Sequence, residues 1–213
     1  MSYVEQAPAH GADSHEPSYE TAVRSNRLGL WLFFVSEIFL FGGMLASLFY
    51  LWRGERPELD QTLALVFTTV LLISSVSMAR AEAAIARGDR RNFSLGLIAT
   101  FIFGLIFLLG VVFFEWGIIY KMGILASEEH HLAPGDGAFG AIFFLMTGMH
   151  ALHVLSGLIF IALIWINGRR GAYSAERHWG VEAIAIYWHY VDLVWIFFYP
   201  ALYLIGTPVA LGG

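Results

Sequence analysis

The sequence contains no cysteine among its 213 residues. This absence excludes thiolate metal sites, iron–sulfur ligation, disulfides and cysteine nucleophiles. Charged side chains are also scarce: they make up 14% of the residues, whereas a soluble domain normally carries about 25%. The deficit falls in long apolar runs, and the mean hydropathy is +0.65. The composition therefore excludes an ordinary soluble domain and predicts an integral membrane protein.

Five apolar runs are long enough to cross the hydrocarbon core as helices, which takes about 20 residues each. They cover residues 28–52, 62–79, 93–120, 138–167 and 181–205. The loops between them are short, and the sequence shows no internal repeat, so we expect one all-α bundle of five transmembrane helices over residues 28–206. Residues 1–27 lack the apolar segment of a signal peptide and are expected to form a polar tail, with a second short tail at 207–213.

The basic residues are distributed unevenly between the two ends of these spans. The tail, the second loop and the fourth loop carry Arg24, Arg27, Arg80, Arg87, Arg90, Arg91, Arg169, Arg170 and Arg177. The opposite side carries only Arg53, Arg56 and Lys121. Because cytoplasmic loops of membrane proteins are enriched in Lys and Arg, this distribution predicts a cytoplasmic N-terminus and an outer C-terminus.

The last apolar run, HWGVEAIAIYWHYVDLVWIFFYP (178–200), carries four titratable side chains on one stripe: His178, Glu182, His189 and Asp192. At 100° per residue they fall within an arc of roughly 80° on a helix. Such a stripe fits a metal site, a proton relay or hydrogen bonds between helices. Its inner end, His189 and Asp192, lies roughly 12–16 Å into the span, close to the depth of Glu37 in the first span at roughly 14 Å. Contact between them is therefore possible.

A second pair, His150 and His153, lies in TGMHALHVLSG. An H-x-x-H pair shares a helix face, but a diiron or haem site would require further ligands on other helices. We therefore expect no metal in this chain, and favour packing, interhelical hydrogen bonding or proton movement for the histidines. The predicted buried polar network comprises Glu37, His150, His153, Glu182, His189 and Asp192.

Basic side chains crowd the predicted cytoplasmic mouth of the last two spans. They are Arg169, Arg170, Arg177 and His178. They fit the topology rule alone, and they also fit a site for a lipid phosphate, since basic pockets at this level bind anionic headgroups. In the first span, Gly42 and Ala46 form a small-xxx-small pair that would allow a close helix approach.

Several segments resemble subunit III of the haem–copper oxidases. They are TGMHALHVLSGLIF, RHWGVEAIAIYWHYVDLVWIFFYPALYLIG, the first span RLGLWLFFVSEIFLFGGMLASLFY, FFEW and GDGAFGAIFF. The resemblance runs from about Arg24 to Gly206, places the family's membrane-embedded carboxylate at Glu37, and places Glu115, within FFEW, in the family's Glu-plus-aromatic segment. This chain lacks the first two of the family's seven spans, as five-span bacterial members do. FFEW also stands where the family usually has Glu followed by tyrosines.

The resemblance implies a non-catalytic subunit of a proton-pumping respiratory oxidase in the bacterial cell membrane. Such a subunit packs on catalytic subunit I, assembles with subunit II and others, holds structural phospholipid, and supports proton uptake and the durability of O₂ reduction. Haem and copper are expected in the partner subunits, and no nucleic-acid partner is expected.

Three alternatives stay open at the level of the sequence. The first is an accessory subunit of a quinol oxidase or a nitric oxide reductase. The second is an autonomous membrane metalloenzyme built on His150, His153, His178 and His189. The third is a small transporter, which the absence of an inverted repeat and of a Pro-broken helix pair disfavours.

Overall fold

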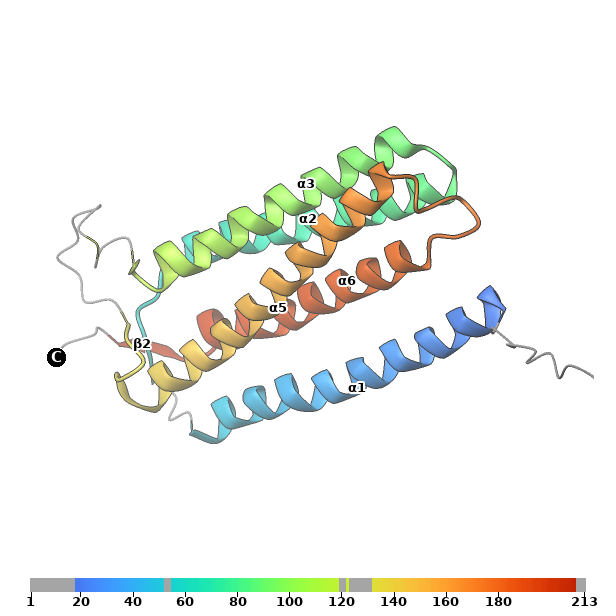
Figure 1. Ribbon diagram of the computed structural model, residues 1–213. Helices are drawn as coiled ribbons and strands as arrows, with labels where there is room; N and C mark the ends of the chain where they lie inside the picture. Colours follow the sequence, from blue (N-terminus) through green and yellow to red (C-terminus); the bar gives the residue numbers. More distant parts are fainter. Residues whose placement is uncertain (1–17, 52–54, 119–121, 123–131, 210–213) are drawn as a thin grey trace, which may run out of the picture.

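The computed structural model describes residues 18–51, 55–118, 122 and 132–209 (Figure 1). Its long helices are α1 (Tyr19–Leu51), α2 (Gln61–Ala86), α3 (Arg90–Gly110), α5 (Gly137–Arg169) and α6 (Trp179–Tyr199). Two π-helical turns, η1 (Val111–Glu115) and η2 (Pro200–Leu204), continue α3 and α6. Within these described residues, five helices are long and apolar enough to cross a membrane. The predicted all-α membrane bundle is therefore confirmed.

The helices extend past several of the predicted apolar spans. Helix α1 begins at Tyr19, inside the segment expected to be a polar tail, and residues 1–17 lie outside the described residues. Helix α2 continues to Ala86 through the segment AEAAIA, whose alanines and glutamate favour helix formation. The break before α3 comes at Gly88, which has φ +76°, and at Asp89, which accepts a hydrogen bond from the Asn92 amide at 3.0 Å.

Helices α2 and α3 form a tight antiparallel hairpin. A Cβ atom added to Gly96 of α3 would lie 2.8 Å from the Cβ of Ala81 on α2, so the two backbones approach closely only because Gly96 has no side chain. Thr100 of α3 also donates to the carbonyl of Ser74 on α2 at 3.3 Å. Small residues thus let the two helices pack without a hydrophobic driving force between them, as is usual in membranes.

Helices α2, α3, α5 and α6 form a four-helix body, in which α6 contacts both α2 and α5. The indole of Trp188 on α6 fills the centre: a Cβ at Gly104 of α3 would lie 2.6 Å from it, and one at Gly157 of α5 would lie 2.8 Å away. Trp195, about two turns further along α6, is also fully buried. These two indoles fix which side of α6 faces inward.

Helix α1 lies outside this body, along its lower edge in Figure 1, and packs against α5 and α6. Its inward side carries Phe34, whose ring stacks on Tyr190 at 4.8 Å, and Phe41, whose ring meets that of Phe198 at 5.7 Å. Most of its other apolar side chains are exposed in the isolated chain. Helix α1 is therefore joined to the body along one narrow line.

The end of the body opposite the α2–α3 turn is closed by the two π-helical turns and a short sheet. Tyr203 of η2 donates to the Glu115 carboxylate of η1 at 2.9 Å, and Gln61 donates to the Tyr203 carbonyl at 2.8 Å. Strand β1 (Glu55–Pro57) pairs in parallel with β2 (Thr207–Val209) beside them. Pro200 has no amide hydrogen, which breaks the α-helical pattern where η2 begins.

Candidate functional site

A buried carboxylate–imidazole contact joins α1 to the four-helix body halfway along both helices. Glu37 Oε2 of α1 lies 3.0 Å from His153 Nε2 of α5, and both side chains are nearly buried. The other ring nitrogen, Nδ1, lies 2.7 Å from the Met149 carbonyl and donates to it. Nε2 therefore either accepts a hydrogen bond from a neutral Glu37 or, in an imidazolium, donates one to the Glu37 carboxylate. Either arrangement satisfies a polar pair that would be costly alone in a membrane.

A second polar cluster lies between α2 and α6. Ser75 of α2 donates to the Asp192 carboxylate, and its oxygen lies 2.9 Å from His189 Nδ1. Asp192 is buried, whereas Ser75 and His189 are half-buried. The sequence allowed His189 and Asp192 to meet Glu37, because all three lie at one depth. The structure pairs Glu37 with His153 on α5 instead and turns His189 and Asp192 toward α2.

His150 takes part in neither cluster. Its ring is stacked on Trp195 at 4.7 Å and meets Phe107 edge-on at 5.7 Å, and both of its nitrogens are buried without a hydrogen-bond partner among the described residues. The H-x-x-H pair is therefore divided: His150 points into the body, and His153 points to α1. The predicted network separates into distinct sites.

Hydroxyl groups on apolar helices hold the core indoles and one tyrosine. Trp188 donates to Ser74 at 2.9 Å, Trp195 donates to Thr68 at 2.9 Å, and Tyr187 lies 2.7 Å from Ser156. We did not predict these partners from the sequence. The signal for Ser74 is the run LLISSVS, and Thr68 and Ser156 likewise place hydroxyls inside apolar spans, where each needs a donor or acceptor from another helix.

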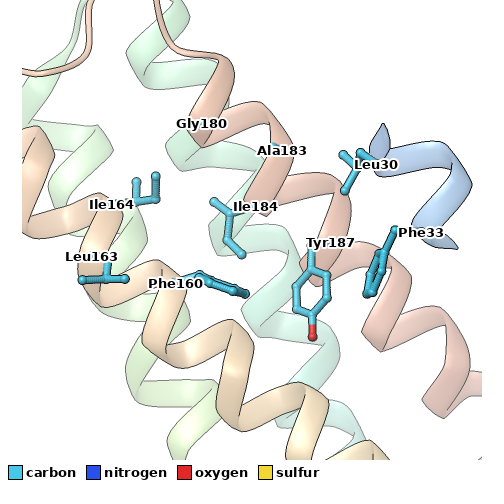
Figure 2. Close-up of a pocket in the computed structure, with 9 residues that line it drawn as sticks. All are labelled: Leu30, Phe33, Phe160, Leu163, Ile164, Gly180, Ala183, Ile184 and Tyr187. Carbon is cyan, nitrogen blue, oxygen red and sulfur yellow. The ribbon is translucent and has the colours of Figure 1, made fainter. Parts of the chain in front are cut away.

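A cleft opens where α1 diverges from α5 and α6, with a volume of about 400 Å³ (Figure 2). Its wall is almost entirely apolar and is formed by Leu30, Phe33, Phe160, Leu163, Ile164, Gly180, Ala183, Ile184 and Tyr187. Figure 2 shows the Tyr187 ring between Phe160 and Phe33. The cleft has the width and chemistry to hold a hydrocarbon chain.

A cavity with charged walls adjoins this cleft, one turn further toward the ends of α1 and α6. Arg27 pairs there with Glu182 at 3.2 Å, and its guanidinium lies 5.2 Å from the centre of the Trp179 ring. Glu182 was predicted in the buried network, but it is only half-buried and belongs to this helix-end pair. The cavity measures about 380 Å³ and is lined by Tyr19, Glu20, Val23, Arg24, Arg27, Glu176, His178, Trp179 and Glu182.

The basic residues predicted at a lipid headgroup are divided between two places. Arg177 lies over the Tyr19 ring at 4.7 Å, and His178 Nδ1 lies 3.1 Å from the Ser174 carbonyl, both beside the charged cavity. Arg169 instead lies over Trp165 at 5.0 Å, where it lines a separate cavity between α3 and α5 together with Arg90. The exposed Arg170 lines none of these cavities.

The described residues offer no group of three or more His, Cys, Asp or Glu side chains that could hold a metal ion. His150, His153 and His189 each face a different neighbour, as described above. What the arrangement offers is hydrogen bonding within the membrane, an apolar cleft, and guanidinium groups at one helix end. These features suit lipid binding and subunit packing.

Comparison with known proteins identifies the family of this chain. The sequence matches the family described as "Cytochrome c oxidase subunit III" over residues 12–207. It is 32% identical over 196 residues to "Cytochrome c oxidase subunit 3" of Equus caballus, covering 85% of this chain and 70% of that protein. It is 30% identical over 209 residues to the proteins of the same name from Rhinoceros unicornis and Bos taurus, covering 91% of this chain and 73% of each. The chain therefore belongs to the cytochrome c oxidase subunit III family.

Proposed function

We propose that this chain is a non-catalytic subunit of a proton-pumping respiratory oxidase in a bacterial cell membrane. It packs on catalytic subunit I, assembles with subunit II and other subunits, and supports proton uptake and the durability of O₂ reduction. Haem and copper are bound by those partners. Its N-terminus faces the cytoplasm and its C-terminus faces outward, in keeping with the distribution of arginines.

The observation that carries this proposal is the apolar cleft with its charged cavity at one end. An acyl chain fits the cleft between Phe33 and Phe160, and a headgroup fits the adjoining cavity. That cavity carries both signs of charge, with Arg24 and Arg27 beside Glu20. A headgroup with a phosphate and an ammonium group complements such walls, because each charge meets its opposite.

The Glu37–His153 contact supports the same role. It holds α1 at the mouth of the cleft through groups that exchange protons but cannot transfer electrons. Together with Ser75, His189 and Asp192 it tunes helix packing and proton supply, and the reduction of O₂ takes place on the partner subunits.

Purification through a tag on this chain tests the proposal. In mild detergent, the haem-containing oxidase subunits should co-purify with it, together with stoichiometric phospholipid. A chain that purifies alone with stoichiometric iron, copper or zinc would instead support an autonomous metalloenzyme. Quinol oxidase or nitric oxide reductase subunits in the preparation would identify the alternative assemblies.

Lipid retention in that preparation tests the basic residues. We expect the double variant Arg169→Ala, Arg177→Ala to retain less phospholipid, because each guanidinium flanks a cavity at the helix ends and can bind a lipid phosphate. The control is Arg80→Ala, which removes a basic residue of α2 that lines none of these cavities. Equal lipid content in the double variant, the Arg80→Ala control and the unaltered chain would show that Arg169 and Arg177 serve only to orient the chain in the membrane.

A further inference from the structure

One side of the molecule carries a polar group where apolar side chains would be expected. We call it the α2–α6 face and define it by Leu72, Val76, His189, Leu193 and Ile196. All of these except His189 are exposed apolar side chains, and Leu193 is 49% exposed. His189 lies about 15 Å from the start of α6, well inside the hydrocarbon depth.

The hydrogen bonds around His189 determine what its free nitrogen requires. The single proton of the Ser75 hydroxyl goes to Asp192, so the Ser75 oxygen accepts from His189 Nδ1. In the neutral imidazole, Nε2 is then an acceptor. Nε2 has no hydrogen-bond partner within the described parts of the chain, and it is not among the fully buried atoms. It therefore faces outward.

Lipid chains cannot satisfy such a group. An unpaired polar atom in hydrocarbon costs several kcal/mol by general estimates, and polar side chains in spans face protein or water for that reason. His189 Nε2 consequently requires a neighbouring molecule that donates a hydrogen bond to it.

The same side of the molecule offers room for apolar side chains. A groove of about 280 Å³ runs between α1 and α6, with Leu193 and Phe197 on one wall and Ile38 and Gly42 on the other. A Cβ at Gly42 would meet no atom within 4 Å, so this small residue serves no contact inside the chain. Small residues at such positions admit close approach by another helix.

We propose that the α2–α6 face, with the adjoining groove, is the docking surface for a transmembrane helix of another oxidase subunit. That helix donates a hydrogen bond to His189 Nε2 from a hydroxyl, amide or indole group, and places apolar side chains in the groove. This inference rests on the proposed function, and it names the surface by which the chain joins the assembly.

Site-specific photocrosslinking in the purified complex tests the docking surface. Benzoylphenylalanine replaces Leu193 on the face, or Leu152 as the control, because Leu152 is 59% exposed and belongs to α5 rather than to α2 or α6. In lipid nanodiscs, Leu193 should yield an adduct with another oxidase subunit, and Leu152 should yield lipid adducts. The inference would be overturned if only Leu152 gave subunit adducts, or if both positions gave subunit adducts in equal yield. An adduct at Leu193 between two copies of this chain would also overturn it.

The role of His189 has its own test in the same complex. His189→Phe keeps a ring without an acceptor and should weaken retention of this chain during detergent washing by about threefold or more, as expected for one interhelical hydrogen bond in a membrane. His189→Gln keeps an acceptor and should restore most of the retention. Equal retention of both variants and of the unaltered chain would overturn the assigned contact. A preparation that lacks every other oxidase subunit would instead refute the proposed function, and the inference with it.

Discussion

At the scale of single residues, the polar groups within the membrane are satisfied in small local sets. Glu37 depends on His153, Asp192 depends on Ser75, and Trp188 and Trp195 depend on hydroxyls of α2. Each set joins two helices, so each polar side chain also specifies a pair of neighbours. Within the described residues the exceptions include His150, which aromatic rings surround, the Tyr190 hydroxyl and His189 Nε2, none of which has a hydrogen-bond partner.

Replacement of Glu37 should affect stability more than catalysis. Glu37→Leu leaves His153 Nε2 unpaired and should lower the free energy of unfolding by about 1–3 kcal/mol, the usual cost of an unsatisfied buried polar group. Unfolding in graded denaturing detergent measures the change, and Glu37→Gln, which can still bond to the ring, should lose less.

The initial rate of O₂ turnover tests whether Glu37 takes part in catalysis. In an intact complex, Glu37→Ala should keep turnover within a few-fold of the unaltered enzyme, because the Glu37–His153 contact holds a helix in place and supplies protons indirectly. Complete loss of activity in a fully assembled Glu37→Ala complex would contradict this role.

At the scale of helices, packing depends on a few glycines that face bulky side chains. Gly104 and Gly157 accommodate Trp188, and Gly96 accommodates Ala81. Helix α1 differs, since Gly42 and Gly43 have open space where a side chain would begin. Glycines in the four-helix body are thus used inside the chain, and those of α1 are available to neighbours outside it.

Substituting alanine for one glycine of each kind should distinguish a glycine that packs against a side chain of this chain from one that faces open space. Gly157→Ala forces a methyl group to within 2.8 Å of Trp188 and should cost about 1–3 kcal/mol of unfolding free energy, as overpacking does. Gly43→Ala, the control, meets no atom within 4 Å and should be neutral or slightly stabilising, because alanine favours helix by about 1 kcal/mol. Equal changes in unfolding free energy for the two purified variants would show that the contact with Trp188 does not set the outcome.

The sequence predicts the helices well and their neighbours poorly, for a physical reason. Span number and approximate position follow from apolar runs, because a fixed membrane thickness sets their length. Partner choice requires the rotation of each helix: Glu37 lies near the depth of both His153 and His189, and depth alone cannot select between them. The rotation of α6 is set by Trp188 packing on Gly104 and Gly157, contacts between residues far apart in the sequence.

At the scale of the whole molecule, the chain is a four-helix body with α1 packed along one edge and an apolar cleft of about 400 Å³ between them. The arginine-rich ends of the helices gather around the cavities at one end of the bundle. Between the two ends, the exposed side chains of the helices are mostly apolar, as expected of a chain surrounded by lipid and by other subunits.

The orientation of the chain can be measured directly, because it has no cysteine. Glu58→Cys and Ala175→Cys place single thiols at exposed positions near opposite ends of the bundle. In spheroplasts, a membrane-impermeant maleimide should label the first variant, and in inverted vesicles it should label the second, because basic loops remain in the cytoplasm. The reverse pattern would invert the proposed topology.

The central claim, a subunit that sustains an oxidase without holding its metals, is tested most directly by removing the chain from the purified complex. Haem and copper per catalytic subunit should stay unchanged, and initial O₂ turnover should persist while activity decays faster during sustained turnover. Loss of haem or copper in proportion to the chain removed would contradict the claim.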